Sequence, residues 1–151
     1  MKKIVIVTIG EPAENDGLSD RGLSPNGLYQ ANEIFISDEW SKLQKPETIF
    51  IGKGKAYSET AEALGLQIQP GQITEICGGA DLNYRAIQEL IGSLDDNSLL
   101  IVEPNFVSPT TYNGVLLEVN IDPAKGYDWP LSKTAGDYVV LFSGEPVFNQ
   151  F

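Results

Sequence analysis

Two short stretches of the chain are apolar at almost every position, which is typical of strands buried on both faces of a sheet. Residues 3–8 read KIVIVT, and residues 98–102 read SLLIV. A strand with one face in water would instead alternate apolar and polar residues. A third run, TIFI at residues 48–51, predicts another strand of the same kind. We therefore expect these segments to form the parallel part of one sheet.

The segments between these runs carry apolar residues at helical spacing. Ser24 and Pro25 form an N-cap and a first-turn proline, and apolar residues then recur on one side of the predicted helix. Residues 57–64 predict a second helix that ends at Gly65, and a short strand is expected near Ile73. Asn83 precedes a third helical pattern whose apolar positions are Ile87, Leu90, Ile91 and Leu94. Strands and helices thus alternate along most of the chain.

The pattern changes after residue 114, where two extended runs replace the alternation. They cover residues 115–121 and 138–142 and are joined by a loop containing proline and glycine. Such a pair predicts antiparallel strands added to the parallel sheet. The expected fold is therefore α/β, with three layers (α/β/α), a mostly parallel sheet, helices on both faces and a C-terminal antiparallel strand pair. At 151 residues the chain matches one ordinary domain, so we expect residues 1–151 to form a single domain.

Charge and cysteine content narrow the possible partners. Twenty-one acidic residues against 10 basic ones give a net charge of −11, which disfavours nucleic acid and anionic lipid as partners. No apolar run is long enough to span a membrane. The lone Cys77 cannot form an internal disulfide and is expected to be a small buried residue. A reducing compartment fits best, so we expect the protein to be cytoplasmic.

The residues that directly follow the apolar runs are the first place to look for chemistry. In an alternating α/β sheet, ligands bind outside the carboxyl ends of the strands. Here these positions are residues 8–11 (TIGE), residues 52–56 (GKGKA) and residues 103–104 (EP). The sequence therefore predicts that any ligand site is built from these segments.

Four segments together resemble the histidine phosphatase superfamily, which is also called phosphoglycerate mutase-like, and most closely its short phosphohistidine phosphatases. They are IVIVTIGEP, the turn and helix that contain Leu23-Ser24-Pro25-Asn26-Gly27 and Gln30-Ala31, IFIGKGKAYSETAEALG, and LLIVEPNF. Each segment is weak by itself, but their order and spacing are those of the family. The resemblance covers about residues 3 to 121 and implies the phosphoglycerate mutase-like version of the expected fold.

The resemblance also implies that the family's catalytic groups are missing. It sets Ile9 at the position of the nucleophilic histidine and Thr8 at that of the neighbouring arginine. Ala56 matches the second arginine, and Pro104 matches the second histidine. The chain contains no histidine at all, and Ile9 has no lone pair with which to accept a phosphoryl group. We therefore expect a pseudoenzyme that is not an enzyme, has no cofactor or metal, and acts as a binding or regulatory module.

The matching positions that remain describe a different pocket. Gly10 and Glu11 stay as the family has them, while Glu103 stands where the family usually has a hydroxyl group. Losing two arginines and gaining a carboxylate should make the pocket favour neutral or cationic groups. Residues that could contact a ligand are Glu11, Arg21, Lys55, Glu75 and Glu103. The partner would be an unidentified protein or a neutral or cationic small ligand, although both glutamates could equally cap backbone amides or face solvent.

Two alternatives stay open from the sequence alone. One is an enzyme of another class that uses Glu11, Glu75 and Glu103 as acid, base or metal ligands. The other is an interaction protein in which the pocket plays no part. Convergence of the carboxylates on one point would favour the first alternative, whereas an exposed apolar patch would favour a partner-binding role.

Overall fold

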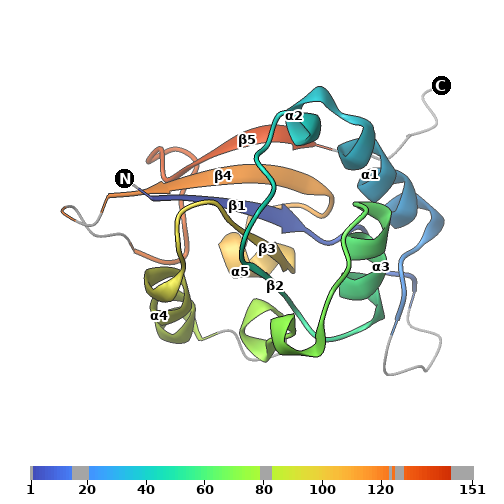
Figure 1. Cartoon of the computed structure of the whole chain (residues 1–151), viewed down its shortest axis with the longest axis horizontal. Helices are drawn as coiled ribbons and strands as arrows, with labels where there is room; N and C mark the ends of the chain where they lie inside the picture. The colour runs from blue at the N-terminus through green and yellow to red at the C-terminus, as the bar shows by residue number, and fades with distance from the viewer. Residues whose placement is uncertain (1, 15–20, 79–82, 123, 125–127, 144–151) are drawn as a thin grey trace.

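One mixed sheet forms the centre of the protein. The structure, a computed structural model, describes residues 2–14, 21–78, 83–122, 124 and 128–143, and within these ranges five strands pair in the order β2-β3-β1-β4-β5 (Figure 1). They are β1 (Lys2–Thr8), β2 (Ile49–Ile51), β3 (Ser98–Val102), β4 (Val115–Ile121) and β5 (Tyr138–Ser143). The pairs β1–β3 and β2–β3 are parallel, and β4 is antiparallel to both β1 and β5. The predicted parallel sheet with its C-terminal antiparallel pair is confirmed.

Helices cover both faces of this sheet, as predicted (Figure 1). On one face lie α1 (Pro25–Ile36), α2 (Asp38–Ser41) and α3 (Lys55–Ala63), and on the other lie α4 (Tyr84–Ser93) and α5 (Pro104–Val107). Two 3₁₀ turns, η1 (Pro70–Gln72) and η2 (Glu75–Cys77), precede α4. No helix within the described ranges combines the length and the apolar character needed to cross a membrane.

β1 joins the two halves of the hydrophobic core, which explains its unbroken apolar sequence. Ile4 and Ile6 belong to the cluster that packs under α4 and α5, whereas Val5 and Val7 belong to the cluster under α1 and α3. All four side chains are at most 3% exposed. Because successive side chains of a strand point to opposite faces, only a continuous apolar run fills both layers.

Three helix ends are as the sequence predicts. The hydroxyl of Ser24 accepts a hydrogen bond of 3.0 Å from the N–H of Gly27 at the start of α1. Asn83 caps α4 in the same way, by accepting bonds from the N–H groups of two first-turn residues that lack a helical partner. Gly65 follows α3 with a φ of +75°, the left-handed conformation that ends many helices.

Three local features differ from the predictions. The strand expected near Ile73 is wrong, since this residue forms only a single bridge to Ile51, between two 3₁₀ turns. α3 begins at Lys55, two residues earlier than expected. The helices α2 and α5 were not predicted, because at 4 residues each they are too short to show a periodic pattern.

Candidate functional site

The carboxyl ends of the three parallel strands meet at one edge of the sheet, where the sequence predicts the site. Thr8 pairs with Val102, and Ile51 pairs with Ile101, so the segments that follow these strands are neighbours. We call the residues of these segments, 8–11, 52–57 and 103–104, the strand-end site. The adjacency that the α/β pattern predicts is therefore present.

Thr8 is a fully buried structural residue of this site. Its hydroxyl donates a hydrogen bond of 2.8 Å to the carbonyl of Tyr112 and accepts one of 2.9 Å from the N–H of Val115. The two bonds fasten the turn before β4 to the end of β1. Because the hydroxyl is enclosed and already paired in both directions, Thr8 presents no polar group to a ligand.

Ile9 and Ala56 fill the centre of the strand-end site with apolar packing. They are 4% and 5% exposed and belong to the same hydrophobic cluster. The backbone of Ile9 is also fully used. Its N–H donates to the carbonyl of Val102, and its carbonyl accepts from the N–H of Gly114 and the amide of Asn113. The middle of the site is thus part of the core and carries no reactive group.

A close backbone crossing holds the next residues of the loop against α1. A Cβ atom on Gly10 would collide with the carbonyl of Gly27, and one on Gly27 would collide with the carbonyl of Glu11. The N–H of Glu11 donates a hydrogen bond of 2.8 Å to the side chain of Gln30. These contacts explain why glycine is needed at both crossing positions.

Glu11 points outward and borders a shallow acidic hollow. Its side chain is exposed and accepts a hydrogen bond of 3.2 Å from the hydroxyl of Ser24, the N-cap of α1. The hollow has a volume of about 340 Å³, and among the described residues its charged lining consists of Glu11 and Glu14. Arg21 is not among the lining residues, and its guanidinium donates to the carbonyl of Ala13 at 3.2 Å. The hollow beside Glu11 is therefore negatively charged, while the exposed Lys53 and Lys55 lie on the 52–57 segment of the same site.

Tyr57 is a member of the site that the sequence analysis did not select. Its ring lies against Gly52 and Gly78, where an added Cβ atom would collide with it. Burial raises the pKa of Tyr57, and the negative charge of the nearby Glu103 raises it further. The phenol therefore keeps its proton and can donate a hydrogen bond. No local signal in the sequence marks Tyr57, because Gly78 lies far from it along the chain and comes beside its ring only in the fold.

Glu103, a member of the strand-end site, lies next to the buried Cys77. Glu103 is half-buried, precedes Pro104 at the start of α5, and donates its N–H to the carbonyl of Cys77 at 3.2 Å. Cys77 is buried, as predicted. Burial raises the pKa of its thiol to about 12, so it stays protonated and is a poor nucleophile.

The carboxylates do not gather into a metal site. Glu11 and Glu75 are both exposed, and Glu75 lies at the start of η2, after the end of β2. Lys55 is exposed at the first position of α3. In the part of the chain that the structure describes, no three His, Cys, Asp or Glu side chains come together in a group that could hold a metal. The alternative of metal chemistry by Glu11, Glu75 and Glu103 gains no support.

Comparisons with known proteins identify the fold. No protein-family model matches the sequence, and no curated protein is similar to it. Among solved structures, the protein histidine phosphatase SixA in complex with tungstate is 16% identical, with a TM-score of 0.63 over 93% of this chain and 95% of that chain. A SixA protein from Agrobacterium tumefaciens is 13% identical, with a TM-score of 0.65 over 96% of this chain and 98% of that chain. The protein TTHB049 from Thermus thermophilus is 15% identical, with a TM-score of 0.57 over 93% of this chain and 98% of that chain.

These likenesses confirm the predicted phosphoglycerate mutase-like fold and correct one prediction. The prediction that the chain is not an enzyme is wrong, because the proteins that share its fold include SixA, named as a protein histidine phosphatase. A chain without histidine lacks one kind of nucleophile, but other side chains can carry chemistry on the same scaffold.

Proposed function

We propose that the strand-end site recognises a neutral or positively charged group, as a binding or regulatory module, and does not transfer phosphoryl groups through histidine. The observation that carries this proposal is the absence of histidine from all 151 positions. A covalent phosphohistidine intermediate needs an imidazole with a free lone pair. Ile9, which the resemblance sets at the nucleophile's position, is an alkyl side chain packed into the core.

The charges around the site support recognition of a cation. The resemblance sets Thr8 and Ala56 at the two arginine positions, and both are buried without charge. The hollow at this edge is bordered by Glu11 and Glu14. Each lost arginine removes a charge-assisted hydrogen bond to a phosphate oxygen, typically ~1.5–3 kcal/mol. In this hollow a phosphate group would therefore meet carboxylates, whereas an amine or guanidinium group would be attracted.

A titration with a single arginine side chain tests this preference. We expect N-acetylarginine amide, added to ¹⁵N-labelled protein, to shift the amide signals of Gly10, Glu11 and Glu14 in a saturable way. Glu11→Gln should weaken this binding about threefold, the size expected for an exposed charge pair. Glu89→Gln is the matched control, because Glu89 is an exposed carboxylate on α4, at the other face of the sheet.

Two results would refute the proposed cation site. One is the absence of saturable shifts at these three amides. The other is an equal loss of affinity in both glutamate variants, which would mean that only the net charge of −11 attracts the probe.

A separate assay tests the proposal that the protein does not transfer phosphoryl groups through histidine. With a phosphohistidine peptide as substrate, we expect no acid-labile phosphoprotein to form. An acid-labile phosphoprotein that forms with the peptide and persists through repeated purification of the protein would contradict the proposal.

A further inference from the structure

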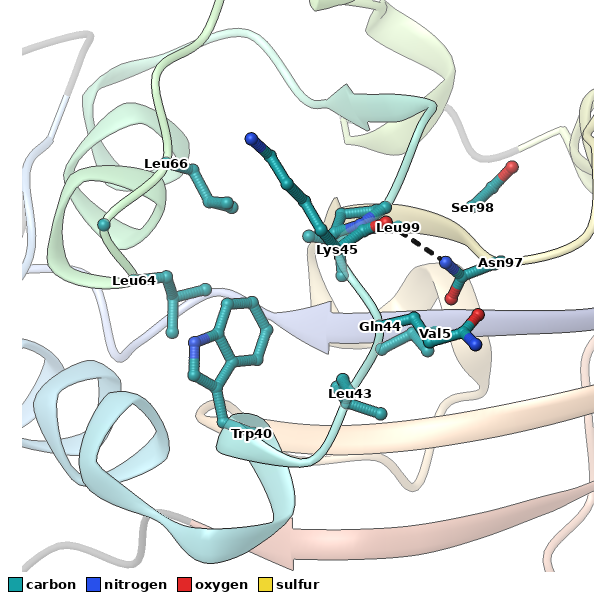
Figure 2. Close-up of a pocket in the computed structure, with 12 residues that line it drawn as sticks. Val5, Trp40, Leu43, Gln44, Lys45, Leu64, Leu66, Asn97, Ser98 and Leu99 are labelled. Atoms are coloured by element: carbon teal, nitrogen blue, oxygen red, sulfur yellow. Dashed lines mark hydrogen bonds between the residues drawn. The ribbon is translucent and has the colours of Figure 1, made fainter.

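A second hollow lies at the other end of the sheet, away from the strand-end site (Figure 2). It has a volume of about 250 Å³ and lies between α2, the segment 42–46 and the end of α3. Its floor includes Val5 of β1 and Leu99, near the amino end of β3. We call it the amino-end cavity. What binds there is independent of the function proposed for the strand-end site.

We propose that the amino-end cavity binds a small aromatic carboxylate. Its apolar wall consists of the indole of Trp40 and the side chains of Leu43, Leu64 and Leu66. In Figure 2 the indole ring reaches toward Leu64, and the side chain of Lys45 extends along the same hollow. A flat apolar body can thus stack on the indole, with a polar end directed to the lysine.

The volume sets the size of the ligand. An apolar cavity of about 150 Å³ is large enough to hold benzene. At about 250 Å³ the amino-end cavity is large enough for a ligand of two fused rings, or for one ring with a short substituent. A nucleotide or a large cofactor would not fit, since such ligands occupy pockets toward the upper part of the ~300–1,000 Å³ range.

The polar groups of the cavity determine the charge of the ligand. Lys45 is the only charged residue of the lining, and it forms no ion pair with any residue in the described ranges. The indole N–H of the half-buried Trp40 likewise donates to no described residue. Both groups are donors, so they suit an acceptor, and the positive charge of the lysine favours a carboxylate over a neutral carbonyl.

Backbone contacts fix the walls of the cavity before any ligand arrives. Asn97, with a φ of 63°, donates its side-chain amide to the carbonyl of Lys45 at 3.2 Å and its N–H to the carbonyl of Lys3 at 2.8 Å. The segment that carries Lys45 is therefore tied to the sheet. On the other side, the N–H groups of Gly65 and Leu66 bond back into the last turn of α3. A preformed pocket of this kind loses little entropy on binding.

A titration with 2-naphthoate tests the proposal through the two tryptophans of the chain. The indole N–H signal of Trp40 should shift in a saturable way, with a Kd on the order of millimolar or tighter for so small a ligand. The signal of Trp129 should stay in place, because this residue is buried in the cluster on the other face of the sheet.

Lysine variants then test the charge assignment. Lys45→Met keeps the apolar stem and should weaken 2-naphthoate binding roughly threefold, while the affinity for the neutral 2-naphthalenemethanol stays unchanged. Lys42→Met is the matched control, since Lys42 is exposed nearby but does not line the cavity. It should change neither affinity.

Three results would overturn the proposal. The first is no saturable shift of the Trp40 signal up to about 20 mM, well above a Kd on the order of millimolar. The second is an equal effect of the two lysine variants. The third is a neutral ligand that is as sensitive to Lys45→Met as the carboxylate, which would assign the lysine a packing role only.

Discussion

The two hollows described above differ in how their surroundings are filled. At the strand-end site, Thr8, Ile9 and Ala56 are buried in the core, and the described hollow is a shallow acidic one beside Glu11. At the amino-end cavity, the side chains around Trp40 leave an apolar space of about 250 Å³. In α/β sheets the carboxyl ends of the strands usually hold the ligand. Here the centre of the usual site is packed, and the hollow with the more apolar wall lies elsewhere.

The hollows differ in charge as well. Glutamates border the hollow beside Glu11, whereas a lysine is the only charged residue among the described residues that line the amino-end cavity. A shared fold therefore does not determine where a chain of this kind binds its ligands. Nor does it determine whether those ligands are positively or negatively charged. The following changes test how firmly the strand-end site is packed.

The largest effect is expected at the backbone crossing of the strand-end site. Gly10→Ala would force a Cβ atom into the carbonyl of Gly27, which belongs to a rigid backbone. We expect the free energy of unfolding in urea to fall by about 3 kcal/mol. Gly71→Ala is the matched control, because an added Cβ there has nothing within 4 Å. Equal stability of the two variants would mean that the backbones at Gly10 and Gly27 can move apart without cost.

A smaller loss is expected when the hydroxyl of Thr8 is removed. Thr8→Val keeps the shape of the side chain but leaves the buried N–H of Val115 without its acceptor. We expect unfolding in urea to become easier by about 2 kcal/mol. The same change at the exposed Thr134, whose hydroxyl contacts that of Ser132, should cost less than about 0.5 kcal/mol. A tolerated Thr8→Val would show that water reaches this position.

The third prediction concerns the pH dependence of stability near Cys77. Burial raises the pKa of this thiol from 9.0 to about 12, so the folded protein holds the proton more tightly than the unfolded chain. Stability is then fully present below the lower value and is lost as the pH rises toward the upper one, by about 1.4 kcal/mol per pH unit. Urea unfolding at several pH values above about 9 should show a steeper loss in the parent than in Cys77→Ala. Equal slopes would mean that the thiol is hydrated.

The sequence predicts the sheet well, because its strands depend on a pattern that burial imposes directly. The continuous apolar runs at residues 3–8 and 98–102 are needed wherever helices cover both faces. The caps Ser24 and Asn83 are equally local, since each satisfies N–H groups of the next few residues. The short α5 and the bridge at Ile73 depend on tertiary contacts and could not be read from periodicity.

The candidate site is less predictable than the sheet, because much of it also depends on tertiary contacts. Its strand-end location follows from topology, and Glu11 could be found there. The role of Tyr57 depends on two glycines far apart in the chain, Gly52 and Gly78, that come together only in the fold. The amino-end cavity likewise lies between α2 and the end of α3, and no local pattern in the sequence predicts it.

A tungstate titration tests the central claim, that the strand-end site does not favour oxyanions. The structure of SixA with tungstate shows that a protein of this fold can hold this tetrahedral oxyanion, so SixA is the positive control. For the present protein we predict no saturable shift of the Gly10 and Glu11 amide signals up to about 10 mM tungstate. Thr8 and Ala56, which the resemblance sets at the family's two arginine positions, supply no charge-assisted donor, and the absence of two such donors weakens binding more than about a hundredfold. Saturable shifts of these two amides at micromolar tungstate would contradict the account.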